Sequence, residues 1–169
     1  DTWHTGGLRG TGSGDMIVRD LVIPAARSVS FLTDKPRAPG PLYAFPIFGL
    51  LAIGIAAVAS GNASAALREF SAEAAGKRMP GGRLLAERGS VQTTFAEAAA
   101  RLHAARAYLI GEVDASWIEA QTSRSISLAR RAHLRLAATH MVRTAADVVR
   151  IVQDLSGGGG VFLANALHR

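Results

Sequence analysis

Histidine side chains are the first candidates for chemistry in this sequence, because imidazole is a common metal ligand. His133 and His140 are seven residues apart, which places them two turns apart on one face of a helix. Metal ligands on one helix are usually three or four residues apart, whereas seven residues span about 10.5 Å. The 169-residue chain also contains no cysteine, which excludes thiolate metal sites and cysteine nucleophiles. The sequence therefore predicts no metal site.

Two glycine-rich stretches could bring the backbone close to a phosphate. Gly7 to Gly14 precedes an expected strand, so it lacks the helix N-terminus that binds pyrophosphate. Gly157 to Gly160 does precede an expected helix, but helix–helix turns also use glycine. No catalytic-serine elbow, acid/base pair of carboxylates, Walker motif or Rossmann fingerprint is present. The catalytic residues are therefore unknown from the sequence.

The basic charge of the chain has two interpretations. Nineteen Lys and Arg residues against thirteen Asp and Glu give a net charge of +6, which is compatible with nucleic-acid binding. The arginines, however, are spread along the chain without interleaved aromatic residues or a block of five basic residues. A run such as residues 129–135 is more typical of a solvated or interfacial helix face. We expect no nucleic-acid partner.

The elements that must position these residues are mainly helical. Apolar residues make up 49% of the chain and charged residues 19%, which excludes disorder and favours an alanine-rich helical protein. Residues 16–23 alternate in character and predict a strand, and the three prolines in 33–41 predict an extended linker. We therefore expect two parts, residues 1–40 and residues 41–169.

Apolar residues at helical spacing predict the elements of the second part. The expected helices cover residues 42–78, 90–121 and 123–156, and a fourth begins near residue 161. Short loops between long helices indicate an antiparallel up-and-down helical bundle with a short β remnant at the N-terminus, a mainly α fold.

The stretch from Tyr43 to Ala59 carries no charge and has the composition of a membrane span. It is slightly short for one and contains Pro46, Gly49 and Gly54. We interpret it as a buried helix and expect no membrane association. Because so apolar a helix would leave a large exposed patch on a monomer, we expect a homo-oligomer, a dimer or a tetramer.

No basic segment with an apolar run and a cleavage site is readable as a signal peptide, and a cytoplasmic location is expected. Because the first residue is Asp1, we interpret the sequence as a truncated or processed chain.

The order of motifs resembles the acyl-CoA dehydrogenase superfamily over essentially the whole chain. The turn from Trp3 to Asp15 and the segment ending in Val22-Ile23-Pro24 look like the end of that superfamily's middle β-domain. The rest is similar to its C-terminal helical domain, with matching features at Lys77-Arg78, Gly82-Arg83-Leu84-Leu85, Gln92 and Gln153. The resemblance implies that the N-terminal helical domain, most of the β-domain and the last helix lie outside this sequence.

Within the superfamily, local features favour the flavin-dependent monooxygenase branch of two-component hydroxylases. The Gly-Thr-Gly-Ser-Gly-Asp turn, the proline-rich linker and residues 165–169 resemble that branch, with departures at Ala166 and His168. The resemblance implies a bound FAD or FMN, a separate flavin reductase, and hydroxylation of an aromatic or similar small substrate with reduced flavin and O₂. Two alternatives stay open: an acyl-CoA dehydrogenase that oxidises an acyl-CoA thioester with FAD, and a non-catalytic oligomerisation module.

The resemblance also implies positions for the site. Arg78 matches an arginine that reaches the flavin phosphate of a neighbouring subunit, and Gln153, Gly157 and Gly158 match a loop at the nucleotide end of the flavin. The residues expected near the substrate and the isoalloxazine ring are Arg9, Thr11 and Ser13. For Arg78 the alternative is a solvated arginine at a helix end, and for the turn residues it is local turn chemistry.

Overall fold

The computed structural model describes residues 2–5 and 8–158 of the chain. The chain divides into two compact units, Asp1–Lys35 and Pro36–Arg169, and each is considered by itself. The boundary expected near residue 41 stays a prediction.

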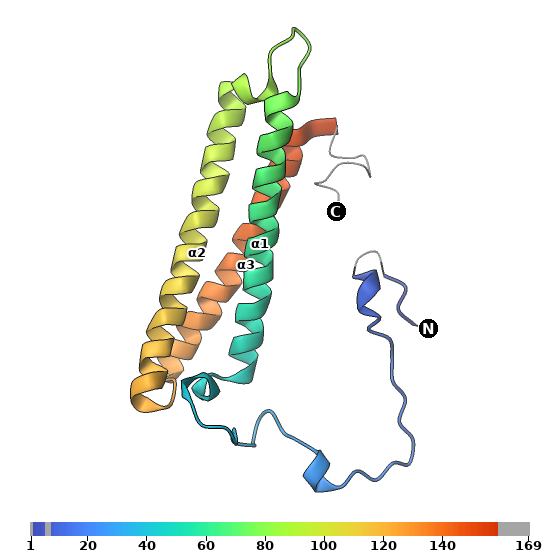
Figure 1. Cartoon of the computed structure of the whole chain (residues 1–169), viewed down its shortest axis with the longest axis vertical. Helices are drawn as coiled ribbons and strands as arrows, with labels where there is room; N and C mark the ends of the chain where they lie inside the picture. Colours follow the sequence, from blue (N-terminus) through green and yellow to red (C-terminus); the bar gives the residue numbers. More distant parts are fainter. Residues whose placement is uncertain (1, 6–7, 159–169) are drawn as a thin grey trace. The chain divides into compact units, whose positions relative to one another are not determined.

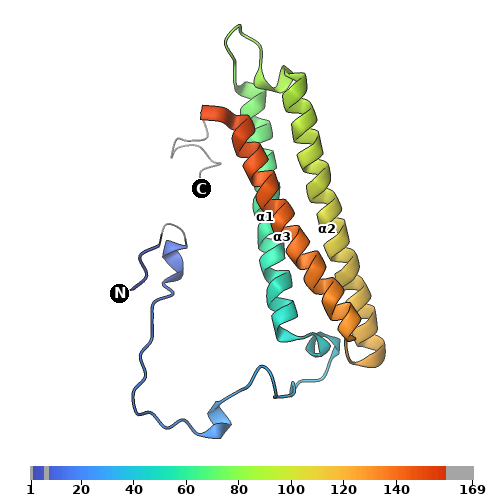
Figure 2. The same cartoon turned by 180° about the vertical axis from the view of Figure 1, so that it is seen from behind.

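The second unit is a bundle of long helices. Its α-helices within the described residues are α1 (Ile47–Gly76), α2 (Gly89–Ser123) and α3 (Leu128–Ser156), preceded and joined by short 3₁₀ turns, η3 (Pro41–Ala44) and η4 (Leu85–Glu87). Helices α1 and α3 run in the same direction and α2 runs against them (Figure 1). Seen from behind, α3 slants across the front of α1 towards the lower end of α2 (Figure 2). The mainly α fold and the antiparallel arrangement are therefore confirmed.

Small side chains let α3 pack closely against the other two helices. Ala137, Ala138 and Ala145 of α3 are buried, as are Ala56 and Ala63 of α1. Alanine has the highest helix propensity and loses no side-chain entropy on burial. The larger side chains that fill the remaining core space are Phe70, Leu102, Met141 and Val148. The contacts of α3 with α1 and with α2 are extensive, whereas the backbones of α1 and α2 come close at few positions and the rings of Phe70 and Phe95 meet between them at 5.8 Å.

The turn between α2 and α3 is held by a carboxylate. Glu119 accepts a hydrogen bond from the backbone N–H of Ser127 at 2.6 Å, and its other oxygen lies 3.5 Å from Nε of Arg130. Ser127 caps α3, because its Oγ accepts from the N–H of Arg130 at 3.3 Å. These interactions, led by the backbone hydrogen bond from Ser127, lower the pKa of Glu119 below its usual value.

Two sequence-based expectations need correction. The strand expected over residues 16–23 is not formed, since these residues are exposed and the β pairing among the described residues is confined to one isolated bridge, Arg78 to Leu84. A strand is stable only when a neighbour pairs with its backbone, and the alternating pattern does not supply that neighbour. The first helix begins at Ile47, not at residue 42, because Pro46 has no N–H to donate and stands at the N-cap. The fourth helix expected from residue 161 lies outside the described residues.

Helix α1 is long and apolar enough to cross a bilayer by length and composition, and 22% of its most apolar window is buried within the chain. Core helices of soluble proteins pass the same test. The expectation that α1 packs against protein and not lipid stays a prediction.

The lowered pKa of Glu119 predicts a pH-dependent stability. A carboxyl whose folded-state pKa is below its unfolded value of about 4.5 stabilises the fold at higher pH, and this contribution disappears as the pH falls through the folded-state pKa. In Glu119→Gln, thermal unfolding followed by circular dichroism should lose less Tm between pH 7 and pH 3 than in the unmodified chain. Glu97→Gln, an exposed change in the same helix, is the control and should leave the pH profile unchanged. Identical pH profiles for Glu119→Gln and the unmodified chain would contradict this role.

Candidate functional site

A polar network joins the C-terminal ends of α1 and α3. Lys77 Nζ donates to the carbonyl oxygen of Ser156 at 2.7 Å and to Oε1 of Glu73 at 2.8 Å. The Ser156 hydroxyl donates to the other Glu73 oxygen at 2.6 Å. Ser156 is buried, and Glu73 and Lys77 are partly buried. A lysine cation at the end of α3 also complements the negative end of the helix dipole.

The network brings the expected flavin-phosphate residues to one end of the bundle. Arg78 directly follows Lys77, and Gly157 directly follows Ser156, so segments that are far apart in sequence meet there. Gln153 is exposed on the last turn of α3. Gly157 ends the helix at a φ of 61°, in the left-handed region that favours glycine. All four of the residues expected at the cofactor therefore lie at one end of the bundle.

Arg78 is held by its own loop. Its backbone bridges to Leu84, and its Nη1 donates to the carbonyl oxygen of Gly82 at 2.8 Å. Gly81 and Gly82 have φ values of 93° and 83°, which lets the chain reverse within a short turn. A guanidinium has five N–H donors, so this contact orients Arg78 and leaves donors for a phosphate. The side chain is exposed at the bundle end.

The space around these turns is open. A Cβ built on Gly81, Gly82, Gly157 or Gly158 would meet nothing within 4 Å among the described atoms. A ligand phosphate can therefore approach the backbone of both turns. The donor set of a guanidinium and accessible backbone groups fits an anionic phosphate or pyrophosphate.

The residues expected near the substrate belong to the other unit. Thr11 Oγ1 donates to the carbonyl oxygen of Leu8 at 2.8 Å and lies 3.1 Å from Oγ of Ser13. Trp3 Nε1 donates to the same carbonyl at 2.9 Å. Thr11 thus performs the local turn chemistry that was the alternative interpretation, and a substrate role for Thr11 and Ser13 stays a prediction. The Arg9 side chain lies outside what the structure describes, as do residues 165–169.

The two histidines on α3 have separate surroundings. Nδ1 of His133 is 3.8 Å from an oxygen of Glu112, whereas the ring of His140 meets Tyr108 edge-on at 6.2 Å. Across the described part of the chain, no three His, Asp or Glu side chains gather as metal ligands would. The expectation of no metal site stays a prediction.

Sequence reasoning missed the network that organises the site. The spacing of Glu73 and Lys77 is that of a helical ion pair, and this signal was readable. The contact of Lys77 with Ser156 joins residues 79 positions apart, and no local pattern marks it.

A long antiparallel helical bundle is a domain of the type that the sequence motifs suggested. The family model described as "Acyl-CoA dehydrogenase, C-terminal domain" matches residues 53–169. The chain belongs to this family, and the resemblance stated above is confirmed.

Three individual relatives of the chain carry names that describe an activity. The chain is similar to an indole-3-acetate monooxygenase of Acinetobacter baumannii, with 34% identity over 170 residues, 99% of the chain and 43% of the relative. A protein of the same name from Pseudomonas putida is 34% identical over 171 residues, 100% of the chain and 43% of that protein. The "FADH(2)-dependent resorcinol hydroxylase, oxygenase component" of a Rhizobium species is 27% identical over 186 residues, 100% of the chain and 46% of that protein. The chain thus spans less than half the length of these curated relatives.

The geometry of Arg78 predicts a loss of flavin affinity on its removal. In the complete gene product, Arg78→Ala should weaken flavin binding by about 1.5–3 kcal/mol, the usual contribution of a hydrogen bond to a charged group. A fluorescence titration with FAD and with FMN measures the change. Arg88→Ala removes another exposed arginine at the start of α2 and should leave the dissociation constant unchanged. Equal losses in the two variants, or none in Arg78→Ala, would contradict a specific phosphate contact.

Proposed function

We propose that this chain is part of a flavin-dependent monooxygenase that uses reduced flavin and O₂ to hydroxylate an aromatic or similar small substrate. Family membership and the names of the relatives support this proposal, since each of the three is called a monooxygenase or a hydroxylase oxygenase component. The observation that carries it for this chain is the joining of Arg78 to the Gly157 turn by the Lys77–Ser156 contact. FAD or FMN is the proposed cofactor.

The chain's own residues would hold the phosphate end of the cofactor. Arg78 would donate its remaining N–H groups to a phosphate, while its bond to Gly82 fixes the guanidinium. The backbone of Gly157 and Gly158 would approach the nucleotide end, with no side chain in the way. Reduced flavin, when bound, supplies the electrons that activate O₂.

Two partner classes belong to the proposal. The name "oxygenase component" carried by one relative supports a separate reductase that delivers reduced flavin, together with a small-molecule substrate.

A second copy of the chain is the other proposed partner. Four large side chains stand exposed on one outward stripe of α1, and we call them the outer stripe: Phe48 (54%), Leu51 (56%), Ile55 (63%) and Val58 (65%). Such a patch favours association with another apolar surface.

The acyl-CoA dehydrogenase and the non-catalytic module remain the competing functions. A dehydrogenase would transfer electrons from an acyl-CoA thioester to FAD and bleach the flavin without a reductase. A module without catalysis would bind no flavin in any form. The relatives' names favour hydroxylation over both.

The decisive experiment combines the complete gene product with a flavin reductase, NADH, FAD or FMN, and an aromatic substrate, beginning with indole-3-acetate and resorcinol. We expect O₂ uptake coupled to a product heavier by one oxygen atom, detected by mass spectrometry. Without the reductase, or without the substrate, no hydroxylated product should form. Bleaching of bound flavin by acyl-CoA in the absence of reductase would instead establish the dehydrogenase. The chain 1–169 alone should bind flavin weakly or not at all and turn over nothing.

Self-association is tested by sedimentation. The chain should sediment as a dimer or tetramer at micromolar concentration, and Ile55→Glu should shift it towards the monomer, because a carboxylate would be buried in the outer stripe. Leu128→Glu changes an exposed apolar residue at the start of α3 and should leave the assembly intact. A monomeric unmodified chain would refute the oligomer.

A further inference from the structure

The carboxylate of Glu73 connects two helix ends that are distant in the sequence. Its Oε1 accepts a hydrogen bond from Nζ of Lys77 at 2.8 Å, and its Oε2 accepts one from the hydroxyl of Ser156 at 2.6 Å. Nζ of Lys77 also donates to the carbonyl oxygen of Ser156 at 2.7 Å. The three residues therefore form a closed ring of hydrogen bonds, and Glu73 takes part in it through both of its oxygens.

The surroundings of this ring favour a single geometry. Ser156 is 2% exposed, and the side chains of Lys77 and Glu73 are 30% and 23% exposed. Partial burial strengthens hydrogen bonds to charged groups, and it makes an unpaired polar group unfavourable. The ring therefore holds the end of α1 at a fixed position relative to the end of α3.

Lys77 connects the ring to the turn that carries Arg78. Its side chain belongs to the ring, whereas its backbone carbonyl oxygen accepts a hydrogen bond from the N–H of Leu85 at 2.8 Å. Leu85 is buried in the core, so it anchors the far end of the same turn. Arg78 thus lies in a turn whose two ends are both held, one of them by the ring.

Ser156 connects the ring to the glycine turn. It is the last residue of α3, and the N–H of Gly157 donates to the carbonyl oxygen of Asp154 as the helix ends. Ser156 contributes both its hydroxyl and its carbonyl oxygen to the ring. A rotation of this helix end would therefore break two hydrogen bonds at once, and the start of the glycine turn is fixed.

We propose that Glu73 is a positioning residue for the flavin phosphate. It holds Arg78 and the turn at Gly157 at the separation that lets both approach one phosphate or pyrophosphate group, without itself touching the flavin. This inference rests on the proposed function, because it requires that Arg78 and the Gly157 turn bind flavin. Two groups that are held in place before the ligand arrives lose less freedom on binding, which increases affinity.

Glu73→Gln breaks the ring with almost no change in shape. An amide has one acceptor oxygen and one NH₂ donor, so it can accept from Lys77 or from Ser156 but presents a donor to the other. In fluorescence titrations of the complete gene product with FAD and with FMN, we expect binding weaker by about tenfold, within the range of coupling inside one hydrogen-bond network. Glu69→Gln removes the same charge from an exposed position one turn earlier in α1 and should leave the affinity unchanged.

A double-mutant cycle distinguishes positioning from a general loss of stability. If Glu73 acts through Arg78, Glu73→Gln should weaken flavin binding by at most about twofold in the Arg78→Ala background. A tenfold loss in both backgrounds would show that Glu73 acts independently of Arg78 and would overturn the proposal.

Ser156→Ala is a second, milder variant, and it carries the test where Glu73→Gln is unstable. It removes one hydrogen bond of the ring at a buried position and adds no volume. We expect flavin binding to weaken by about threefold when Arg78 is present and to stay unchanged in the Arg78→Ala background. Unchanged binding in both backgrounds would count against the ring.

Hydrogen–deuterium exchange tests the positioning without any flavin, since amide exchange reports local opening of the structure. In the flavin-free complete gene product, Glu73→Gln should increase exchange in the segments 77–88 and 153–158 together. The turn between α2 and α3, residues 120–130, should exchange as in the unmodified protein. Unchanged exchange in the first two segments would overturn the role of Glu73.

The failure of this inference and the failure of the proposed function give different results. Weaker flavin binding in Arg78→Ala together with unchanged binding in Glu73→Gln would overturn the role of Glu73 and leave the flavin site intact. Increased exchange in Glu73→Gln, with flavin binding unchanged in both variants, would refute the phosphate site itself and with it the role of Glu73.

Discussion

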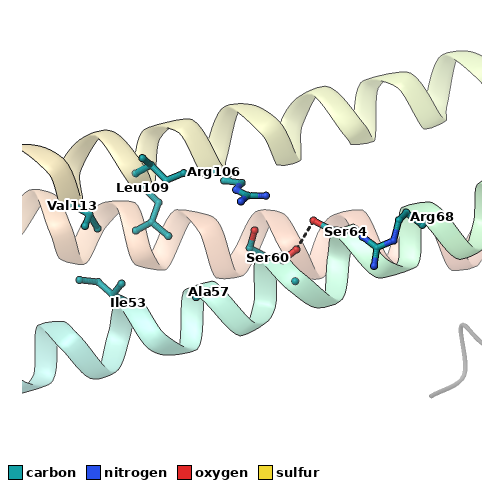
Figure 3. A pocket seen from close by; sticks show the side chains of 10 residues that line it. Ile53, Ala57, Ser60, Ser64, Arg68, Arg106, Leu109 and Val113 are labelled. Atoms are coloured by element: carbon teal, nitrogen blue, oxygen red, sulfur yellow. Dashed lines mark hydrogen bonds between the residues drawn. The ribbon is translucent and has the colours of Figure 1, made fainter.

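Close packing of α3 against both other helices is the contact on which the rest of the bundle depends. The buried positions of α3 recur every three or four residues from Leu134 to Val152, and several are alanine. Small side chains allow close helix approach. The resulting dispersion contacts and burial of apolar surface hold both α1 and α2 against α3. The same arrangement keeps α1 and α2 apart. The packing of α3 against both helices therefore creates the core and leaves an open groove between α1 and α2 (Figure 3).

The candidate cofactor end follows from the same packing. Because α1 and α3 run in the same direction and lie side by side, their C-termini meet, and Lys77 reaches the last carbonyl of α3. Burying Ser156 and partly burying Glu73 costs desolvation. Three hydrogen bonds offset this cost: Lys77 donates to Glu73 and to the backbone carbonyl of Ser156, and the Ser156 hydroxyl donates to Glu73. The exposed neighbours, Arg78 and Gly157, then stand on a fixed frame. The proposed phosphate site thus depends on residues that hold Arg78 and Gly157 in place without being expected to touch a phosphate themselves.

Local patterns account for what the sequence predicted correctly. Apolar spacing located the long helices, and the glycines that begin at Gly157 marked the end of α3. The strand over residues 16–23 was wrong because strand hydrogen bonds are made to another segment, and alternation along one segment does not provide it. The Lys77–Ser156 contact and the groove between α1 and α2 both depend on which helices pack together. The periodicity of apolar residues within one helix does not say which helix it packs against. Placing Arg78 and Gly157 in one site required the family resemblance.

The composition of α1 reflects its three different surroundings. One face packs into the core through Ala56, Ala63 and Phe70. A second face is the outer stripe, which begins at Phe48, and a third faces the groove towards α2 and runs from Ile53 to Arg68. A helix with apolar residues on every face has little amphipathic character and therefore resembles a membrane span. The faces differ in side-chain size and charge, however: the face towards α2 has small residues such as Ala57 and Gly61 and ends at Arg68, whereas the outer stripe has large side chains and no charge. Such differences around one helix match neighbours that differ from face to face, which is the arrangement that the proposed oligomer would supply.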